Sequence, residues 1–416
     1  MLGGAALKGV LIIGGGTAGI SAARTLSRFG IQSTIVEKAP CVGGQANELA
    51  CKGVRECVKC DVCLAVDDVT YALQDENIHF VTGAKVELLE RDLGRYRVTL
   101  ESYPGIIDRS KCMACARCLD ACSSNAIGRY MSREGPLLQI DIDACKHDTE
   151  GCHECQDACE REAIDLDQEA EGQQVEADAV IVATGSTPFD PKLDPRLGYG
   201  TVPGVITSLE AERFINLMGT LPDPLGKGVA KVAFVQCVGS RDPRLQAHLC
   251  SKVCCKYAMK LARQAATANK ALNISFFFMD WRPTDRQDDL LAWARTNDKV
   301  EAIRSRPAEI VLGEDGRPTV RYAIPDDAGI AESGFDLVVL SIGLRPNSDN
   351  KTLADMLGAR LGPHGFFFGE GKMVSALESK GIFFTGACTG PKDIEESAMD
   401  GAAAASKAAR YLEAER

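Results

Sequence analysis

The 416-residue chain is long enough for two or three domains, each with its own hydrophobic core. Its formal net charge of −11 argues against nucleic acid as a partner, because no basic surface is available to neutralise phosphates. No apolar run reaches the length of a membrane-spanning helix, so we expect no direct membrane insertion and contact with a membrane only through a partner protein.

Cysteine is abundant, with eighteen residues. Since the sequence shows no secretion signal, this number predicts metal or redox chemistry rather than disulfides. Thirteen of the cysteines lie between Cys41 and Cys159, and the others are Cys237, Cys250, Cys254, Cys255 and Cys388.

A glycine-rich loop follows the first apolar run. Residues 8–13 read as a strand, GGGTAG at 14–19 as a tight turn, and the following residues as a helix. In such a turn the first glycine bends the chain, the second lets the backbone approach a pyrophosphate, and the third allows close packing of helix on strand. The next strand ends on an acidic residue that can accept hydrogen bonds from a ribose. These features predict a dinucleotide site formed by Gly14, Gly16, Thr17, Ala18, Gly19, Glu37 and Lys38.

Two further segments indicate that the dinucleotide is FAD. The strand DAVIVATG (178–185) and the strand–turn–helix beginning GIFFTGACTG (381–390) resemble segments of FAD-containing disulfide-reductase-like flavoproteins. The aspartate usual in the second motif is Ala387 here, so backbone groups are expected to replace one hydrogen bond. We expect the flavin ring between the Gly43–Gly44 loop and the Pro391–Ile394 turn, with Lys392 either stabilising negative charge on the reduced flavin or lying solvated at the surface. The predicted contacts are Gly43, Gly44, Gln45, Thr184, Gly185, Gly386, Ala387, Lys392, Asp393 and Ile394.

A second glycine loop for a nicotinamide cofactor is not expected. The strand at 231–236 leads into CVGSRDP, whose one glycine is Gly239, so the backbone cannot come close to a pyrophosphate. Asp280 ends the following strand, either as an acid for a ribose or as a turn residue.

The run CMACARCLDAC (112–122) has the spacing of bacterial ferredoxins, in which three close thiolates hold one cubane and the fourth ligates its neighbour. A second run repeats the pattern with a longer first gap. The pattern predicts one [4Fe–4S] cluster on Cys112, Cys115, Cys118 and Cys159, and another on Cys145, Cys152, Cys155 and Cys122. Structural zinc is the alternative.

Two further cysteine groups leave more alternatives open. Cys51, Cys57, Cys60 and Cys63 suit a third cluster, a reactive thiol pair or zinc. Cys237, Cys250, Cys254 and Cys255 suit a fourth cluster at a helix N-terminus, or buried packing. We expect Cys41 and Cys388 to be packing residues.

The predicted fold class is α/β: a thioredoxin-reductase-like flavoprotein with two dinucleotide-binding domains and an inserted two-cluster ferredoxin (α+β) domain. The FAD domain is expected at 1–106, 171–226 and 346–416, the ferredoxin-like domain at 107–170, and a degenerate nicotinamide-domain-like part at 227–345. Residues 95–100 and 173–185 should belong to one small sheet on either side of the insertion.

The order of GGGTAG, CVKC, the ferredoxin runs, QCVGSRD with CSKVCC, and GPKDIEESA resembles the A-type iron–sulfur flavoprotein family of heterodisulfide reductases. Within it the chain is most similar to the A-type component of the quinone-interacting membrane-bound oxidoreductases of sulfate reducers. That resemblance implies an oxidoreductase subunit with FAD and [4Fe–4S] clusters, cytoplasmic and held at the membrane by partners. The implied partners are a homologous flavoprotein subunit, adenylylsulfate reductase and a membrane quinone-interacting subunit. The alternatives are an electron-bifurcating heterodisulfide-reductase-type subunit, a soluble NAD(P)H-dependent reductase, and a metal-binding assembly protein. No catalytic nucleophile or histidine–carboxylate pair is evident.

Overall fold

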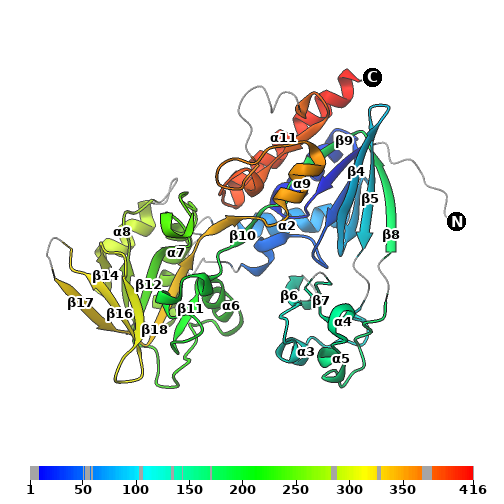
Figure 1. The fold of residues 1–416 in the computed structure, drawn as a ribbon. Helices are drawn as coiled ribbons and strands as arrows, with labels where there is room; N and C mark the ends of the chain where they lie inside the picture. Colours follow the sequence, from blue (N-terminus) through cyan, green and yellow to red (C-terminus); the bar gives the residue numbers. More distant parts are fainter. Residues whose placement is uncertain are drawn as a thin grey trace.

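The computed structural model describes residues 9–49, 51, 57, 60–102, 106–132, 135–142, 144–168, 171–282, 288–325, 329–367 and 377–415. Within these ranges the chain forms two α/β parts, and a small cysteine-rich part lies beside the first (Figure 1).

The first α/β part is built on a five-stranded parallel sheet with the strand order β20-β9-β1-β2-β3. Strands β1 and β9 are buried along their whole length, as expected for parallel strands that are covered on both faces. The strands are Gly9–Ile13 (β1), Gln32–Glu37 (β2), Ile78–Thr82 (β3), Ala179–Val182 (β9) and Ile382–Phe384 (β20).

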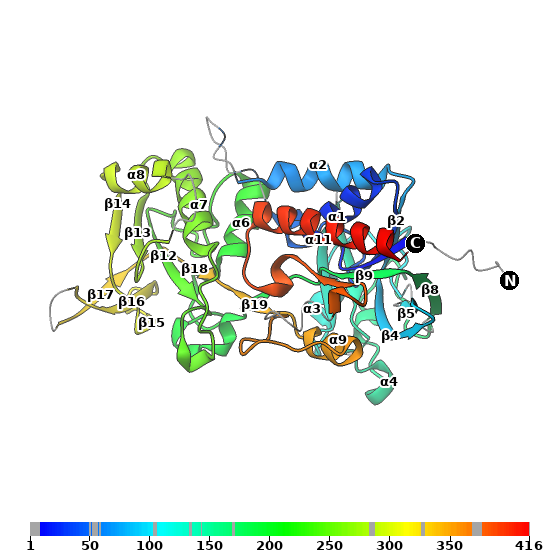
Figure 2. The same ribbon diagram turned by 90° about the horizontal axis from the view of Figure 1, so that it is seen from above.

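Different layers cover the two faces of this sheet. Because side chains alternate along a strand, Val10 and Ile12 pack with the helices, whereas Leu11 and Ile13 pack with a small antiparallel sheet. Helices α1, α2 and α11 lie together in Figure 2. The helices are Thr17–Arg28 (α1), Val62–Leu73 (α2) and Ile394–Ala414 (α11), and the antiparallel strands are Ala84–Asp92 (β4), Arg95–Ser102 (β5) and Glu171–Ala177 (β8).

The cysteine-rich part leaves the first part after β5 and returns to it at β8. Strands β5 and β8 pair directly, with Val98 opposite Val175, as expected for the two sides of an insertion. The prediction that all of 173–185 belongs to this small sheet was wrong, because β9 forms part of the parallel sheet instead. The core of this part contains Leu138, Ile140 and several cysteines. Its elements are Arg117–Ala121 (α3), Ile127–Ser132 (β6), Gly135–Ile140 (β7), His147–Glu150 (α4) and Glu154–Asp157 (α5).

The second α/β part repeats the architecture of the first. Its parallel sheet has the order β11-β18-β12-β13-β14, with helices α6, α7 and α8 on one face and the antiparallel β15–β16–β17 sheet on the other. The parallel strands are Val205–Thr207 (β11), Lys231–Val238 (β12), Asn273–Phe277 (β13), Val300–Ile303 (β14) and Leu337–Ile342 (β18). The remaining elements are Ser208–Met218 (α6), Cys254–Ala268 (α7), Asp288–Thr296 (α8), Glu309–Leu312 (β15), Pro318–Ala323 (β16) and Ile330–Gly334 (β17).

Two short antiparallel strands carry the chain between the two α/β parts. Thr187 in the first strand pairs with Arg345 in the second. These strands are Ser186–Pro188 (β10) and Leu344–Pro346 (β19), and helix Asn350–Leu357 (α9) follows. Short 3₁₀ turns occur at Gly44–Glu48 (η1), Pro191–Leu193 (η2), Pro195–Leu197 (η3), Pro243–Leu245 (η4) and Gly386–Thr389 (η5).

Strand β12 is longer than the sequence predicts. It was expected to end at residue 236, but it continues to Val238 through Cys237, which has a left-handed φ of 59°. The register against β18 shifts between Val235 and Val238, so Cys237 occupies a bulge and one further pair, Val238 with Ile342, forms beyond it.

Candidate dinucleotide and cysteine sites

The glycine turn after β1 leaves open space at the start of α1. Gly14 has a φ of 108°, and a Cβ on Gly19 would lie 2.0 Å from the Gly14 carbonyl oxygen, so both positions require glycine. Around Gly16, by contrast, the nearest atom to an added Cβ is the Cα of Gly44 at 4.0 Å. The N-terminal N–H groups of α1 therefore face a space that a phosphate can enter.

Glu37 ends β2 and stabilises the same turn. Its Oε2 accepts a hydrogen bond from the Gly15 N–H at 2.7 Å, and its Oε1 accepts one from the Ala39 N–H at 2.8 Å. Burial raises the pKa of Glu37, although the two N–H groups act in the opposite direction. The carboxyl group lines the neighbouring cavity, where an acceptor for ribose hydroxyls is expected.

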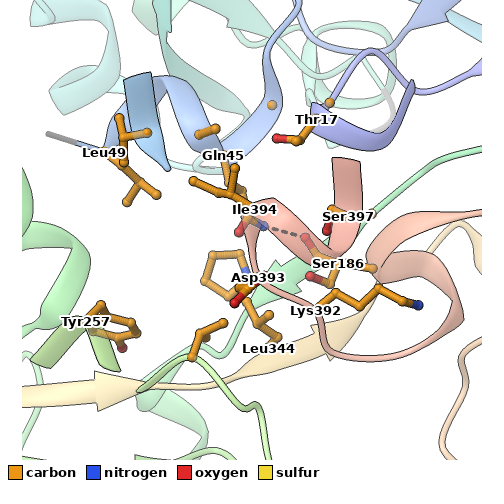
Figure 3. A pocket seen from close by; sticks show the side chains of 18 of the residues that line it. Thr17, Gln45, Leu49, Ser186, Tyr257, Leu344, Lys392, Asp393, Ile394 and Ser397 are labelled. Atoms are coloured by element: carbon orange, nitrogen blue, oxygen red, sulfur yellow. Dashed lines mark hydrogen bonds between the residues drawn. The ribbon is translucent and has the colours of Figure 1, made fainter. Parts of the chain in front are cut away.

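A cavity of about 330 Å³ extends from this turn to the second α/β part. Figure 3 shows Thr17, Gln45 and Leu49 on one side of it and Tyr257 on the other. The side-chain amide of Gln45 donates a hydrogen bond to the Ser186 carbonyl in β10. The cavity therefore lies between the two α/β parts, beside the strands that join them.

Most of the residues predicted to bind FAD line this cavity. Gly19, Gly43 and Gly386 do not line it, and Lys38 forms an ion pair with Asp349 at 3.3 Å. The predicted residues that line the cavity are Gly14, Gly16, Thr17, Ala18, Glu37, Gly44, Gln45, Thr184, Gly185, Ala387, Lys392, Asp393 and Ile394.

The turn that carries Ala387 in place of the usual aspartate is stabilised by another acid. Asp400 of α11 accepts a hydrogen bond from the Gly386 N–H at 2.8 Å and lies 3.3 Å from the Lys392 ammonium. Lys392 also donates to the Gly386 carbonyl at 3.1 Å. Its ammonium is thus bonded within the turn, and a role in stabilising flavin charge stays a prediction.

Sequence reasoning missed a set of charged residues that reach the cavity from α6 and α7. Glu212, Lys256 and Lys260 are buried and line it, and the Lys256 ammonium lies 3.2 Å from the Asp393 carboxylate at the start of α11. Two lysines four residues apart on a helix whose buried face is otherwise apolar were the available signal. With Asp393 included, this wall carries two ammonium groups and two carboxylates, so these four side chains have no net formal charge.

The cysteines lie in groups that could hold a metal ion or a larger iron–sulfur cluster. Among the residues that the structure describes, no three Cys, His, Asp or Glu side chains stand close enough together to hold a single metal ion. A four-iron cluster is larger than one ion, so its fit depends on the grouping of the thiols and on the polar groups that face them.

In the cysteine-rich part, two buried cysteines each have electrostatic neighbours in both cysteine runs. Burial raises the pKa of Cys118, and raises that of Cys155 to about 11. Cys112, Cys115 and Cys159 raise the pKa of Cys118 further by electrostatic repulsion. Cys122, Cys145 and Cys118 act in the same way on Cys155.

The backbone of this part has an internal pseudo-two-fold repeat. Ile107, five residues before Cys112, forms an antiparallel bridge with Ile164, five residues after Cys159. In the same way Ile127, five residues after Cys122, pairs with Ile140, five residues before Cys145.

The repeat extends to hydrogen bonds on sulfur. The N–H of Ala126 donates to the Cys122 sulfur at 3.3 Å, and that of Ala163 donates to the Cys159 sulfur at 3.4 Å. N–H donors on thiolate sulfurs are a feature of iron–sulfur sites, so these residues fit two clusters.

The group at Cys237 is the most deeply buried. Cys237, Cys254 and Cys255 are 3%, 1% and 3% exposed. The Cys254 thiol lowers the pKa of Cys237 to about 7, and the Arg241 guanidinium acts in the same direction. Cys250 is half-buried, and its sulfur accepts the Lys252 N–H at 3.4 Å.

Polar side chains around this group lack partners. In the part of the chain that the structure describes, the buried hydroxyls of Ser240 and Ser341 and both polar atoms of the Gln236 side chain have no hydrogen-bond partner. Such orphaned groups beside clustered thiols fit a bound group that would satisfy them better than they fit inert packing.

The group at Cys51 borders the cavity. Cys51, Cys57 and Cys63 are exposed, whereas Cys60 is half-buried and lines the cavity. Residues 52–56, 58 and 59 lie outside the described residues, so the predicted cluster here is not tested.

The remaining two cysteines, Cys388 and Cys41, belong to none of the predicted cluster groups. Cys388 is fully buried, and its thiol donates to the carbonyls of Thr385 and Val182 at 3.0 and 3.4 Å. Cys41 is half-buried next to the Gly43–Gly44 loop.

Fold and site together define a class: an α/β protein with two dinucleotide-binding domains of the thioredoxin reductase type. A family profile for NAD(P)-binding Rossmann-like domains matches residues 12–64. Thioredoxin reductase of Thermoplasma acidophilum (TM-score 0.55) and the FR conformation of the Lactococcus lactis enzyme (TM-score 0.54) superpose over 99% and 98% of this chain and 100% and 99% of theirs. Both are 16% identical to it, so they establish the fold alone.

Proteins similar in sequence identify the family within this class. The chain is 33% identical to the second A-type iron–sulfur subunit of CoB–CoM heterodisulfide reductase from Methanopyrus kandleri, over 97% of this chain and 64% of that protein. It is also 33% identical to the A-type subunit of ferredoxin:CoB–CoM heterodisulfide reductase from Methanosarcina mazei, over 98% of this chain and 53% of that protein. The chain therefore belongs to the family of A-type heterodisulfide reductase subunits, although it spans only about half to two-thirds of these relatives.

No helix in the described part of the chain has the length and apolar composition needed to cross a bilayer.

Proposed function

We propose that this chain is an electron-transfer subunit of a heterodisulfide-reductase-type oxidoreductase, with FAD in the cavity and [4Fe–4S] clusters on its cysteine groups. One observation carries the proposal: cysteine groups meet the dinucleotide cavity from two directions. Cys60 lines it directly, and α7 begins with Cys254 and Cys255 and then lines it through Lys256 and Tyr257.

The proposed FAD site uses the residues described above. The start of α1 would face the pyrophosphate and Glu37 the adenosine ribose. The flavin would lie beside Gly44, Gln45 and the Asp393–Ile394 start of α11.

The proposed clusters of the cysteine-rich part are interleaved. One is held by Cys112, Cys115, Cys118 and Cys159, and the other by Cys145, Cys152, Cys155 and Cys122. The pseudo-two-fold repeat and the paired N–H···S hydrogen bonds support this ferredoxin-like arrangement. A zinc site would not require such a repeat.

The proposed third and fourth clusters are those on Cys51–Cys63 and Cys237–Cys255. The orphaned polar groups around Cys237 support the fourth. For the third, a reactive thiol pair and zinc remain the alternatives.

Bound FAD exchanges electrons in pairs or singly, whereas a [4Fe–4S] cluster takes one at a time. The chain's own contribution is placement and exclusion of water. Tyr257 lines the cavity, and its hydroxyl donates to the Ile342 carbonyl at 2.8 Å and lies 2.7 Å from the Ser208 hydroxyl, so its ring is held in place. A fixed side chain next to Cys254 and Cys255 in α7 suits single-electron transfer between neighbouring groups.

The names of the matched relatives favour the heterodisulfide-reductase-type assembly over the quinone-linked assembly that the sequence also predicts. The proposed partners are other subunits of such an assembly. A membrane quinone subunit, adenylylsulfate reductase and attachment of the complex to the membrane belong to the quinone-linked alternative, which predicts that a quinol analogue reoxidises or reduces the assembled complex.

An NAD(P)H-dependent reductase has less support. Asp280, the candidate ribose acid, is bonded by Arg241 and Arg282 instead, and the chain has no second glycine loop.

The test is anaerobic photoreduction of the flavin with EDTA as electron donor, followed by low-temperature EPR. We expect cluster signals to grow as the flavin bleaches, and we expect a variant that cannot bind FAD to show no such growth. Bleached flavin beside fully oxidised clusters would refute the proposal. Bleaching by NADPH in the dark would favour the soluble reductase.

A further inference from the structure

Arginines gather at the carboxyl end of the second parallel sheet, where a nicotinamide cofactor would bind in a two-domain flavoprotein. An arginine at such a position commonly accommodates a 2′-phosphate. Here the guanidinium groups are engaged otherwise. Arg241 pairs with Asp280, with its Nη2 3.3 Å from Oδ2, and Arg306 donates to Asp242 at 2.7 Å and to the Arg241 carbonyl at 3.3 Å.

These arginines surround Cys237. The bulge in β12 places Cys237 just before the turn that carries Arg241, and the Ser240 N–H closes this turn on the Cys237 carbonyl at 3.2 Å. Arg241 directly follows this turn, and Arg306, which donates to the Arg241 carbonyl, lines one small cavity together with Cys237 and Arg244. The Arg241 side chain is 18% exposed, so water screens it only in part.

Positive charge is in excess here. Arg241, Arg244, Arg282 and Arg306 share two carboxylates, Asp242 and Asp280. A cubane on four thiolates carries net negative charge, and each added electron increases it. Nearby cations therefore stabilise the reduced cluster more than the oxidised one, and net charge and hydrogen bonds to sulfur are the main determinants of cluster potential.

We propose that Arg241 is a positioning residue that raises the reduction potential of the cluster on Cys237, Cys250, Cys254 and Cys255. This inference rests on the proposed function, since it requires a cluster at these cysteines. One electron enters the cluster from a one-electron donor, no covalent bond changes, and the guanidinium stays protonated throughout. The arginines at the carboxyl end of the second parallel sheet would thus set the potential of the cluster beside them.

Asp280 provides a test of opposite sign. Asp280 neutralises part of the Arg241 charge, so its removal should increase the effect of that charge on the reduction potential of the cluster. If the Arg241–Asp280 pair only stabilised the fold, substitution of either residue would shift the potential in the same direction or cause loss of iron.

The experiment is an EPR-monitored redox titration of the anaerobically purified full chain, with the signal of this cluster assigned by its loss in Cys250→Ser. We expect Arg241→Gln to lower the midpoint by 59 mV or more, which is a tenfold change in the one-electron equilibrium. Arg241→Lys should lower it less, and Asp280→Asn should raise it. Arg321→Gln is the matched control, because Arg321 also bonds two carboxylates but lies on the β15–β17 sheet.

An unchanged midpoint in both Arg241→Gln and Asp280→Asn, with iron content intact, would overturn the inference and leave the proposed function standing. If Arg241→Gln does not retain iron, the Asp280→Asn variant tests the inference. A raised midpoint supports it, and a lowered or unchanged midpoint overturns it. If Cys237→Ser and Cys250→Ser lose no iron, the cluster itself is absent and this part of the proposed function fails.

Discussion

Replacing Gly16 with alanine should remove the flavin while leaving the fold intact. An added Cβ has its nearest neighbour at 4.0 Å, and φ of Gly16 is −77°, which any residue can adopt. Alanine reduces the freedom of the unfolded chain, worth about 0.4–1 kcal/mol, but caps a helix less well than glycine by a similar amount. The two effects offset, so we expect little change in the stability of the flavin-free protein.

With FAD bound, the same methyl group would occupy the space that the pyrophosphate needs. Overpacking of this kind costs about 1–3 kcal/mol, or about 5- to 150-fold in affinity. The assay is an anaerobic FAD titration of deflavinated protein by flavin fluorescence, with urea unfolding of the flavin-free form alongside it.

Gly19→Ala is the matched control. Its Cβ would lie 2.0 Å from the Gly14 carbonyl oxygen whether or not FAD is present, so it should destabilise the flavin-free protein by about 1–3 kcal/mol. Unchanged FAD affinity in Gly16→Ala, or a loss of stability equal to that of Gly19→Ala, would refute the assignment of the α1 N-terminus to the pyrophosphate.

Three further substitutions test other parts of the account. Lys256→Met should cost about 3 kcal/mol in urea unfolding, because it removes the ion-pair partner of the largely buried Asp393 carboxylate. Asp242→Asn should cost about 2 kcal/mol at pH 7, because neighbouring arginines hold the Asp242 pKa at about 2. That pKa is depressed, so the contribution is present above the ordinary value of 3.8, and the difference between the two proteins should shrink as the pH falls toward 2. Cys159→Ser should abolish the cluster of the first cysteine run and Cys122→Ser that of the second, as seen by iron content and EPR; loss of the same-run cluster instead would contradict the interleaved assignment.

The first half of the dinucleotide site could be predicted because its determinants are local. Gly14, Gly16, Gly19 and Glu37 lie within one strand–helix–strand unit, and each has a fixed place relative to the strand ends. Cysteine spacing is local in the same sense, because it constrains which thiols can meet, and the interleaved ligation of the two ferredoxin runs stays a prediction from that spacing.

The other wall of the cavity could not be predicted in this way. Glu212, Lys256 and Lys260 belong to the second α/β part, more than 170 residues from the glycine turn. Their place at the cavity depends on how the two parts pack together, and no local pattern in a single sequence encodes that packing. The bulge at Cys237 was missed because a left-handed cysteine inside a strand has no sequence signal comparable to glycine.

The most direct test of the central claim is the content of iron and acid-labile sulfide per FAD in anaerobically isolated protein. The account predicts about sixteen irons and as many sulfides per FAD, four for each cysteine group. About eight would confine the clusters to the cysteine-rich part and contradict the claim that clusters meet the flavin cavity at Cys60 and at the start of α7.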